Sequence, residues 1–169
     1  MEPRFNLFDT AVGAKFAKRF ANAGLALLQS SLPKTTQDLV MLRASQINGC
    51  GYCTDAHSKD LAHAGEAATR INLVAAWRES TVFTEAERAA LALAEEGTRV
   101  ADAAQGVSDE TWAQVREHYD DEQLAALVAV VAQINAANRL GVILRQQGGS
   151  YEPGMFEVAA DRARTAGFA

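Results

Sequence analysis

The sequence has few cysteines, prolines and histidines: two, three and three among 169 residues. The cysteines, Cys50 and Cys53, are so close that a bond between them would close too small a loop to stabilise a secreted domain. No stretch approaches the roughly 18 consecutive apolar residues of a membrane span. Charged residues such as Asp9 and Lys15 also interrupt any apolar leader near the N-terminus. We therefore predict a cytoplasmic protein with no membrane partner.

Positive charge is also in deficit, with 16 Lys and Arg against 21 Asp and Glu, giving a formal net charge of −5. This balance argues against nucleic acid as the main partner, because binding to phosphate backbones needs an excess of basic residues. No glycine-rich phosphate loop is visible either. We expect no nucleotide, flavin, haem or metal cofactor.

Alternation of apolar and polar residues at period two is missing as well, so the sequence favours an all-α fold. We predict one domain over residues 1–169, with an N-terminal arm at 1–8 and a core at about 30–147. Phe16, Phe20, Leu25 and Leu28 are spaced like the buried face of a first helix. Helices are predicted at about 10–30, 35–47, 52–64, 66–78, 84–101, 108–119, 122–147 and 155–165.

Several of these helices have recognisable ends. Thr35 or Thr36 is expected to cap the second helix, and Asp120 or Asp121 the long one. Thr84 and Glu87 have the spacing of a capping box. Gly148 and Gly149 are expected to stop the long helix.

One short pattern occurs twice. Ala44–Asn48 reads ASQIN and residues 131–135 read VAQIN, and each follows an amphipathic run. The pattern is consistent either with coincidence in alanine-rich helices or with an internal helical repeat whose second copy lacks the cysteines.

The feature around which the chain is organised is Cys50-Gly51-Tyr52-Cys53 followed by His57. Cys53 and His57 are four residues apart and share one helical face. The free N–H groups of a helix N-terminus stabilise a thiolate, and a neighbouring imidazole can accept the thiol proton. The pattern favours a redox-active thiol pair with its own base.

Other uses of the pair are less consistent with the sequence. Structural zinc needs four ligands, and His57 with His63 or His118 would have to complete the set. A c-type haem needs a histidine directly after the second cysteine, where Thr54 stands. A thioredoxin-like motif needs a βαβ context, which the helical pattern does not provide.

The spacing Asp38, eleven residues, Cys50-x-x-Cys53, three residues, His57 resembles the alkylhydroperoxidase AhpD-like, carboxymuconolactone decarboxylase family. The likeness extends over about residues 30–145. The family's redox members have Glu where this chain has Asp38.

This resemblance implies an all-helical fold assembled as a homo-trimer or homo-hexamer, and thiol-dependent reduction of hydroperoxides. Cys53 would be the attacking thiol, Cys50 the resolving thiol, and His57 with the acidic residue a proton relay. The electron donor would be a dithiol, either a lipoyl group or a thioredoxin-like protein. Two alternatives are a disulfide-relay adaptor serving a separate peroxidase and a non-catalytic helical assembly module. For Asp38 the alternative is a first-turn carboxylate that only stabilises its helix.

Overall fold

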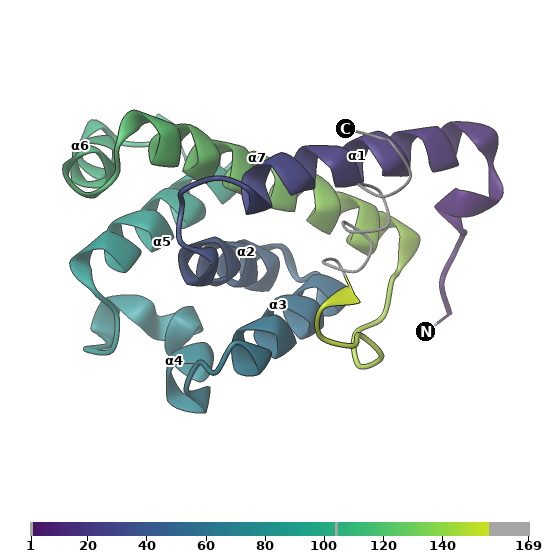
Figure 1. The fold of residues 1–169 in the computed structure, drawn as a ribbon, viewed down its shortest axis with the longest axis horizontal. Helices are drawn as coiled ribbons and strands as arrows, with labels where there is room; N and C mark the ends of the chain where they lie inside the picture. The colour runs from purple at the N-terminus through teal and green to yellow at the C-terminus, as the bar shows by residue number, and fades with distance from the viewer. Residues whose placement is uncertain (1, 104, 156–169) are drawn as a thin grey trace.

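The computed structural model describes residues 2–103 and 105–155, and every regular element in these ranges is a helix (Figure 1). The all-α prediction is therefore confirmed. The helix predicted at 155–165 lies outside the described residues from residue 156 onward. The elements are the 3-10 turn η1 (Leu7–Asp9), α1 (Ala11–Leu28), α2 (Lys34–Asn48), α3 (Gly51–His63), α4 (Ala68–Leu73), η2 (Val74–Glu79), α5 (Glu85–Thr98), α6 (Asp109–His118) and α7 (Asp121–Leu144).

Most predicted helix starts agree with the structure. The side chain of Thr10 caps α1, Thr84 and Glu87 form the capping box of α5, and Ser108 caps α6. Asp120 caps α7 and forms a second capping box with Gln123.

Two helix ends differ from their predictions. The cap at Thr35 or Thr36 is wrong, because α2 begins at Lys34 directly after Pro33, whose ring cannot donate a backbone hydrogen bond. The stop at Gly148 and Gly149 is also wrong, because Arg145 adopts a left-handed conformation (φ 57°) and ends α7 at Leu144.

The core forms where α2, α5 and α7 pack against one another, with α3 alongside α2 (Figure 1). Leu39, Val40 and Leu42 of α2 are buried, as the sequence predicts. Glu95 of α5 accepts hydrogen bonds from Arg43 Nε at 2.6 Å and Trp77 Nε1 at 3.0 Å. These contacts fix α2, which carries part of the site described below.

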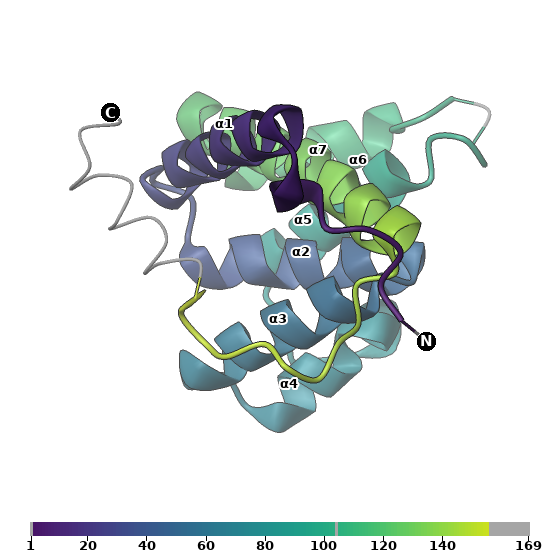
Figure 2. The same ribbon diagram turned by 90° about the vertical axis from the view of Figure 1, so that its right-hand side faces the viewer.

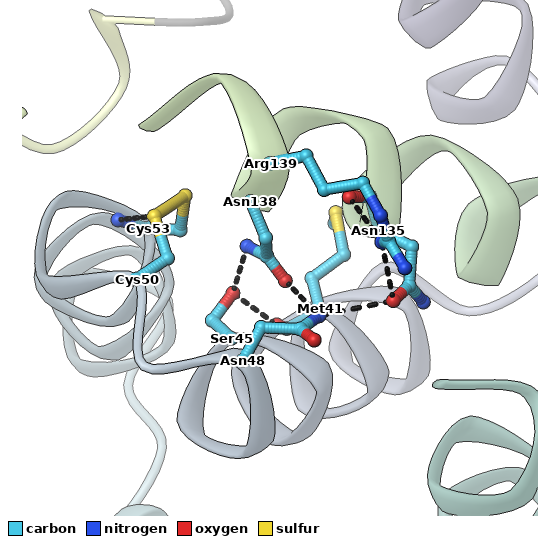
Figure 3. Close-up of a disulfide and its surroundings, with 8 residues drawn as sticks. All are labelled: Met41, Ser45, Asn48, Cys50, Cys53, Asn135, Asn138 and Arg139. Atoms are coloured by element: carbon cyan, nitrogen blue, oxygen red, sulfur yellow. Dashed lines mark hydrogen bonds between the residues drawn. A yellow bond between two sulfur atoms is a disulfide. The ribbon is translucent and has the colours of Figure 1, made fainter. Parts of the chain in front are cut away.

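A polar network joins α2 to α7 (Figure 3). Asn138, fully buried, donates to Ser45 Oγ at 3.0 Å. Asn48 donates to the side-chain oxygens of Asn135 and Asn138, both at 2.9 Å. Buried amides must find partners, so this network fixes the register of the two helices. It also brings the two copies of the repeated pattern into contact, while the internal repeat itself stays a prediction.

Helix α7 is long and apolar enough to cross a membrane by length and composition, with a mean hydropathy of 1.6 over its best window. Of that window 33% is buried, and α7 contacts α1, α2, α3 and α5 and holds the buried Asn138.

Helix α1 departs most from its prediction. Its expected buried face is not buried, since Gly13 is its one buried residue and Phe16 is 47% exposed. In Figure 2 α1 lies across α7 on the outer side of the bundle, and the N-terminal arm turns back from its start. Phe16, Phe20, Leu25 and Leu28 instead line a cavity.

Candidate functional site

The turn between α2 and α3 places the two cysteines. Gly49 adopts a left-handed conformation (φ 68°) that a side chain would disfavour, and this ends α2. Cys50 follows in an extended conformation as the N-cap of α3, as predicted. Cys53 lies in the first turn of α3. The local sequence Asn48-Gly49-Cys50 thus produces a helix N-terminus at the thiols.

Cys50 and Cys53 form a disulfide, with their Cα atoms 5.4 Å apart. This separation lies within the usual range for a disulfide, so the pair closes without displacement of the backbone. The structure therefore shows the oxidised state of the pair.

The environments of the two sulfurs differ. Cys50 is 1% exposed, and its Sγ accepts a hydrogen bond from the backbone N–H of Cys53 at 3.3 Å. Cys53 is 6% exposed and lines a cavity, which Cys50 does not. A molecule in the cavity therefore meets the Cys53 side of the disulfide. The N–H contact to Cys50 was not foreseen from the sequence.

His57 and Asp38 come together at the same cavity. His57 lies one turn after Cys53 on α3, and its Nδ1 is 3.6 Å from Asp38 Oδ1 on α2. Both side chains are buried. The separation is slightly longer than a hydrogen bond, so the two groups are close enough to exchange a proton after a small movement or through one water.

The structure changes the interpretation of Asp38. Because α2 begins at Lys34, Asp38 lies in the second turn and is not the first-turn carboxylate that we considered. Its Oδ2 forms an ion pair with Lys34, one turn earlier. Within the described residues no hydrogen bond reaches its Oδ1, which faces His57. Asp38 therefore does not act on its helix as a first-turn charge. It pairs with Lys34 on one side and faces His57 on the other.

A further carboxylate, Asp60, lies beside this pair. Ligand atoms of Asp38, His57 and Asp60 all lie within 4.8 Å of one another, so these three residues are the candidate metal ligands among the described residues. Each carboxylate already has another partner, however. Lys34 pairs with Asp38, and the Tyr151 hydroxyl donates to both Asp60 oxygens at 2.9 and 3.0 Å. Lys34 and Tyr151 thus already supply positive charge or a donor to each carboxylate, while Asp38 Oδ1 faces His57.

Residues 146–154, here called the strap, cover the outer side of α3 (Figure 2). Backbone N–H groups of Gly149 and Tyr151 donate to Asp55 at 2.7 and 3.2 Å, and Lys59 donates to both of their carbonyls. At Gly148, a Cβ would lie 2.6 Å from the carbonyl oxygen of Gly51. The strap therefore rests directly on the turn that carries the cysteines.

Two ionisable groups under the strap, Asp55 and Tyr52, have shifted pKa values. Partial burial opposes ionisation of Asp55, but hydrogen bonds from Lys59, Gly149 and Tyr151 outweigh it and lower the pKa of Asp55. Burial, with the charges of Asp55 and Asp60, raises the pKa of Tyr52. Tyr52 packs edge-on against Tyr151, with ring centroids 6.1 Å apart. Asp60 and Tyr151 were not predicted as site residues. The i, i+3 spacing of His57 and Asp60 on α3 is a signal that could have found Asp60, whereas no short-range signal joins Tyr151 of the strap to α3.

Comparison with known proteins supports the resemblance found in the sequence. A model of the carboxymuconolactone decarboxylase family matches residues 14–96. The uncharacterised protein YdfG of Bacillus subtilis is 40% identical over 122 residues, which are 72% of this chain and 82% of YdfG.

Two solved structures have similar folds. A protein of unknown function from Agrobacterium tumefaciens, ATU0492, described as a candidate antioxidant defence protein AhpD, is 33% identical with a TM-score of 0.80. The match covers 89% of this chain and all of that one. The debrominase Bmp8 is 18% identical with a TM-score of 0.71, covering 92% of this chain and 80% of Bmp8.

Proposed function

Since this chain belongs to the AhpD-like, carboxymuconolactone decarboxylase family, we propose that it is a thiol-dependent hydroperoxide reductase. The observation that carries the proposal is the placement of Cys53 and His57 at one cavity, with Cys50 bonded to Cys53 behind them. The match to a candidate antioxidant defence protein supports the proposed reduction of hydroperoxides.

In the proposed reaction the reduced protein holds two thiols, and His57 accepts the proton of Cys53. The Cys53 thiolate attacks the terminal oxygen of a hydroperoxide and the O–O bond breaks. The alkoxide leaves with the proton held by His57, so that an alcohol and a Cys53 sulfenic acid remain. The Cys50 thiol then attacks the Cys53 sulfur, and water leaves as the disulfide forms. Two thiols and one hydroperoxide thus give one disulfide, one alcohol and one water.

The remaining residues have supporting roles in this scheme. Asp38, whose Oδ1 is 3.6 Å from His57 Nδ1, orients the imidazole, and Lys34 holds the carboxylate in place. A dithiol donor, a lipoyl group or a thioredoxin-like protein, reduces the disulfide again by thiol–disulfide exchange.

The test is the stopped-flow reaction of the reduced protein with hydroperoxides in the absence of any other peroxidase. We expect consumption of hydroperoxide in wild type, none in Cys53→Ser, and a single sulfenic acid at Cys53 in Cys50→Ser, trapped with dimedone. Peroxide loss only after a separate peroxidase is added would show that the protein is a relay adaptor instead.

We also propose that the protein assembles as a closed homo-trimer or homo-hexamer. Val12, Val128, Val142 and Ile143 on α1 and α7 are exposed and do not line the cavity. Closed symmetric assembly would cover such a surface. Light scattering should report a multiple of 18.1 kDa at micromolar concentration. A monomer would contradict the proposal.

A further inference from the structure

The cavity at Cys53 is larger and more apolar than attack on a small peroxide requires. Its volume is about 550 Å³, within the range of about 300–1,000 Å³ typical of small-molecule sites. Four phenylalanines line it: Phe5 and Phe8 of the N-terminal arm, and Phe16 and Phe20 of α1. Phe16 and Phe20 stack on each other, with centroids 5.7 Å apart.

The polar groups of the cavity are concentrated around the catalytic residues. Asp38, His57 and Asp60 cluster together, while two of the other polar side chains of the lining are bound to backbone. Gln37 donates to the carbonyls of Leu27 and Leu32, and Gln133 donates to that of Phe20. A molecule in the cavity would therefore meet reactive groups beside Cys53 and mainly hydrocarbon elsewhere.

The arm that supplies two of the phenylalanines has a defined position. The backbone N–H of Arg4 donates to Leu144 O at 3.0 Å, and its guanidinium donates to Ile143 O at 3.3 Å. At its other end, a Cβ on Gly13 would lie 2.0 Å from Leu7 O, so the arm meets α1 at a contact that only glycine allows. The arm is thus fastened both to the end of α7 and to the start of α1.

The arm also lies outside the part of the chain that matches the family model, which begins at residue 14. It forms one wall of the cavity that Cys53 also lines. Phe5 and Phe8 are 51% and 65% exposed, and Phe16 is 47% exposed. An apolar molecule between them would remove this aromatic surface from water, which favours binding.

We propose that the N-terminal arm, residues 4–9, is a specificity-determining wall, and that the cavity binds apolar compounds carrying an aromatic ring. The occupant is a small molecule because arm, α1, α2, α3 and α7 all contribute to the lining, and because the cavity contains the reactive sulfur. The choice of an organic hydroperoxide as the reacting species rests on the proposed function; the binding of an apolar ring does not.

The test uses 2-phenyl-2-propanol, the redox-inert alcohol produced from cumene hydroperoxide, with the full-length oxidised protein. Its binding is measured by NMR titration in wild type, Phe8→Ala and Phe16→Ala. We expect saturable binding to wild type that weakens about fivefold in each variant, equivalent to ~1 kcal/mol for a half-buried ring. The kcat/KM for cumene hydroperoxide should fall relative to that for H2O2 by a similar factor.

The matched control is Trp112→Ala, which removes an aromatic ring that is 42% exposed on α6 and does not line the cavity. It should leave binding and the substrate ratio unchanged. Equal binding by all variants, or no binding to wild type, would overturn the inference. So would dissociation of an oligomer by Phe8→Ala or Phe16→Ala, because it would make the face a subunit interface. If only the proposed function fails, the result is different. No peroxide is consumed, but the alcohol still binds to wild type and binds more weakly to the two phenylalanine variants.

Discussion

Gly141 of α7 offers a direct probe of how closely the long helix is fitted to the disulfide. A Cβ at this position would lie 2.7 Å from Cys50 Sγ and 3.6 Å from Cys53 Sγ. The first distance is shorter than real carbon contacts allow. The sulfur cannot swing away, because it is bonded to Cys53 at the fixed start of α3. The helix or the disulfide must therefore shift in Gly141→Ala.

Two effects compete in this variant. Replacing glycine by alanine inside a helix normally stabilises by about 1 kcal/mol. Overpacking a close-fitted site costs about 1–3 kcal/mol. We expect a net loss of about 1 kcal/mol in the free energy of unfolding of the oxidised protein.

The loss should be smaller in the reduced protein, where the Cys50 side chain is released from the bond and can rotate. If half of an overpacking cost of about 2 kcal/mol is relieved in the reduced form, ~1 kcal/mol weighs on the oxidised form alone and makes the disulfide easier to reduce. It corresponds to a reduction potential more positive by about 20 mV, since about 30 mV equals 1.4 kcal/mol for a two-electron couple.

The assay is urea unfolding of the oxidised and reduced proteins, combined with a redox titration followed by mass spectrometry. The control is Gly24→Ala, whose Cβ would lie 2.9 Å from Gln133 Nε2, the end of a flexible side chain that can adjust its hydrogen bond to Phe20 O and that lies away from the disulfide. Gly24→Ala should be neutral or stabilising with an unchanged potential. If Gly141→Ala behaves in the same way, the close fit between α7 and the disulfide is refuted.

The remaining predictions concern the acid–base groups. In the reduced protein Cys53 should be alkylated before Cys50 at neutral pH, and His57→Ala should move the rate profile of Cys53 to higher pH without unfolding the protein; faster alkylation of Cys50 would reverse the assigned roles. Asp38→Asn should slow peroxide turnover about tenfold or more, and Asp38→Glu, with a longer side chain, should retain activity; an alkylation profile unchanged in Asp38→Asn would exclude the relay role. The pKa of Asp55 is lowered in the folded protein. The stability that its bonds to the strap contribute is therefore fully present above the ordinary carboxyl pKa of about 3.9, and it is lost as the pH falls through the lowered folded-state value. Asp55→Asn should therefore speed amide hydrogen exchange at the strap residue Tyr151 at neutral pH, and unchanged exchange would show that Asp55 does not hold the strap.

The sequence was sufficient where its signals are local. The capping box of α5, the cap of α7, the helix N-terminus at Cys50 and the i, i+4 pairing of Cys53 with His57 follow from residues within one or two turns. Helix α1 shows the limit of such reasoning. Its apolar residues have the spacing of a buried helix, but a helix that lines a cavity has the same spacing.

Contacts between elements that are far apart in the chain could not be predicted from the sequence. Asp60 follows His57 by three residues on α3, but its place in the site depends on how α2 brings Asp38 beside both residues. Tyr151, 91 residues later, donates to it. Asp38 was identified through the family spacing, yet its distance from His57 depends on how α2 packs beside α3.

The most direct test of the central claim is a single-turnover titration of the fully reduced protein with one equivalent of cumene hydroperoxide. Intact-mass and peptide mass spectrometry measure the Cys50–Cys53 disulfide, and chromatography measures the alcohol released. The account predicts one disulfide and one alcohol per hydroperoxide consumed, with no disulfide in Cys53→Ser. Unchanged hydroperoxide with both thiols still reduced would contradict it.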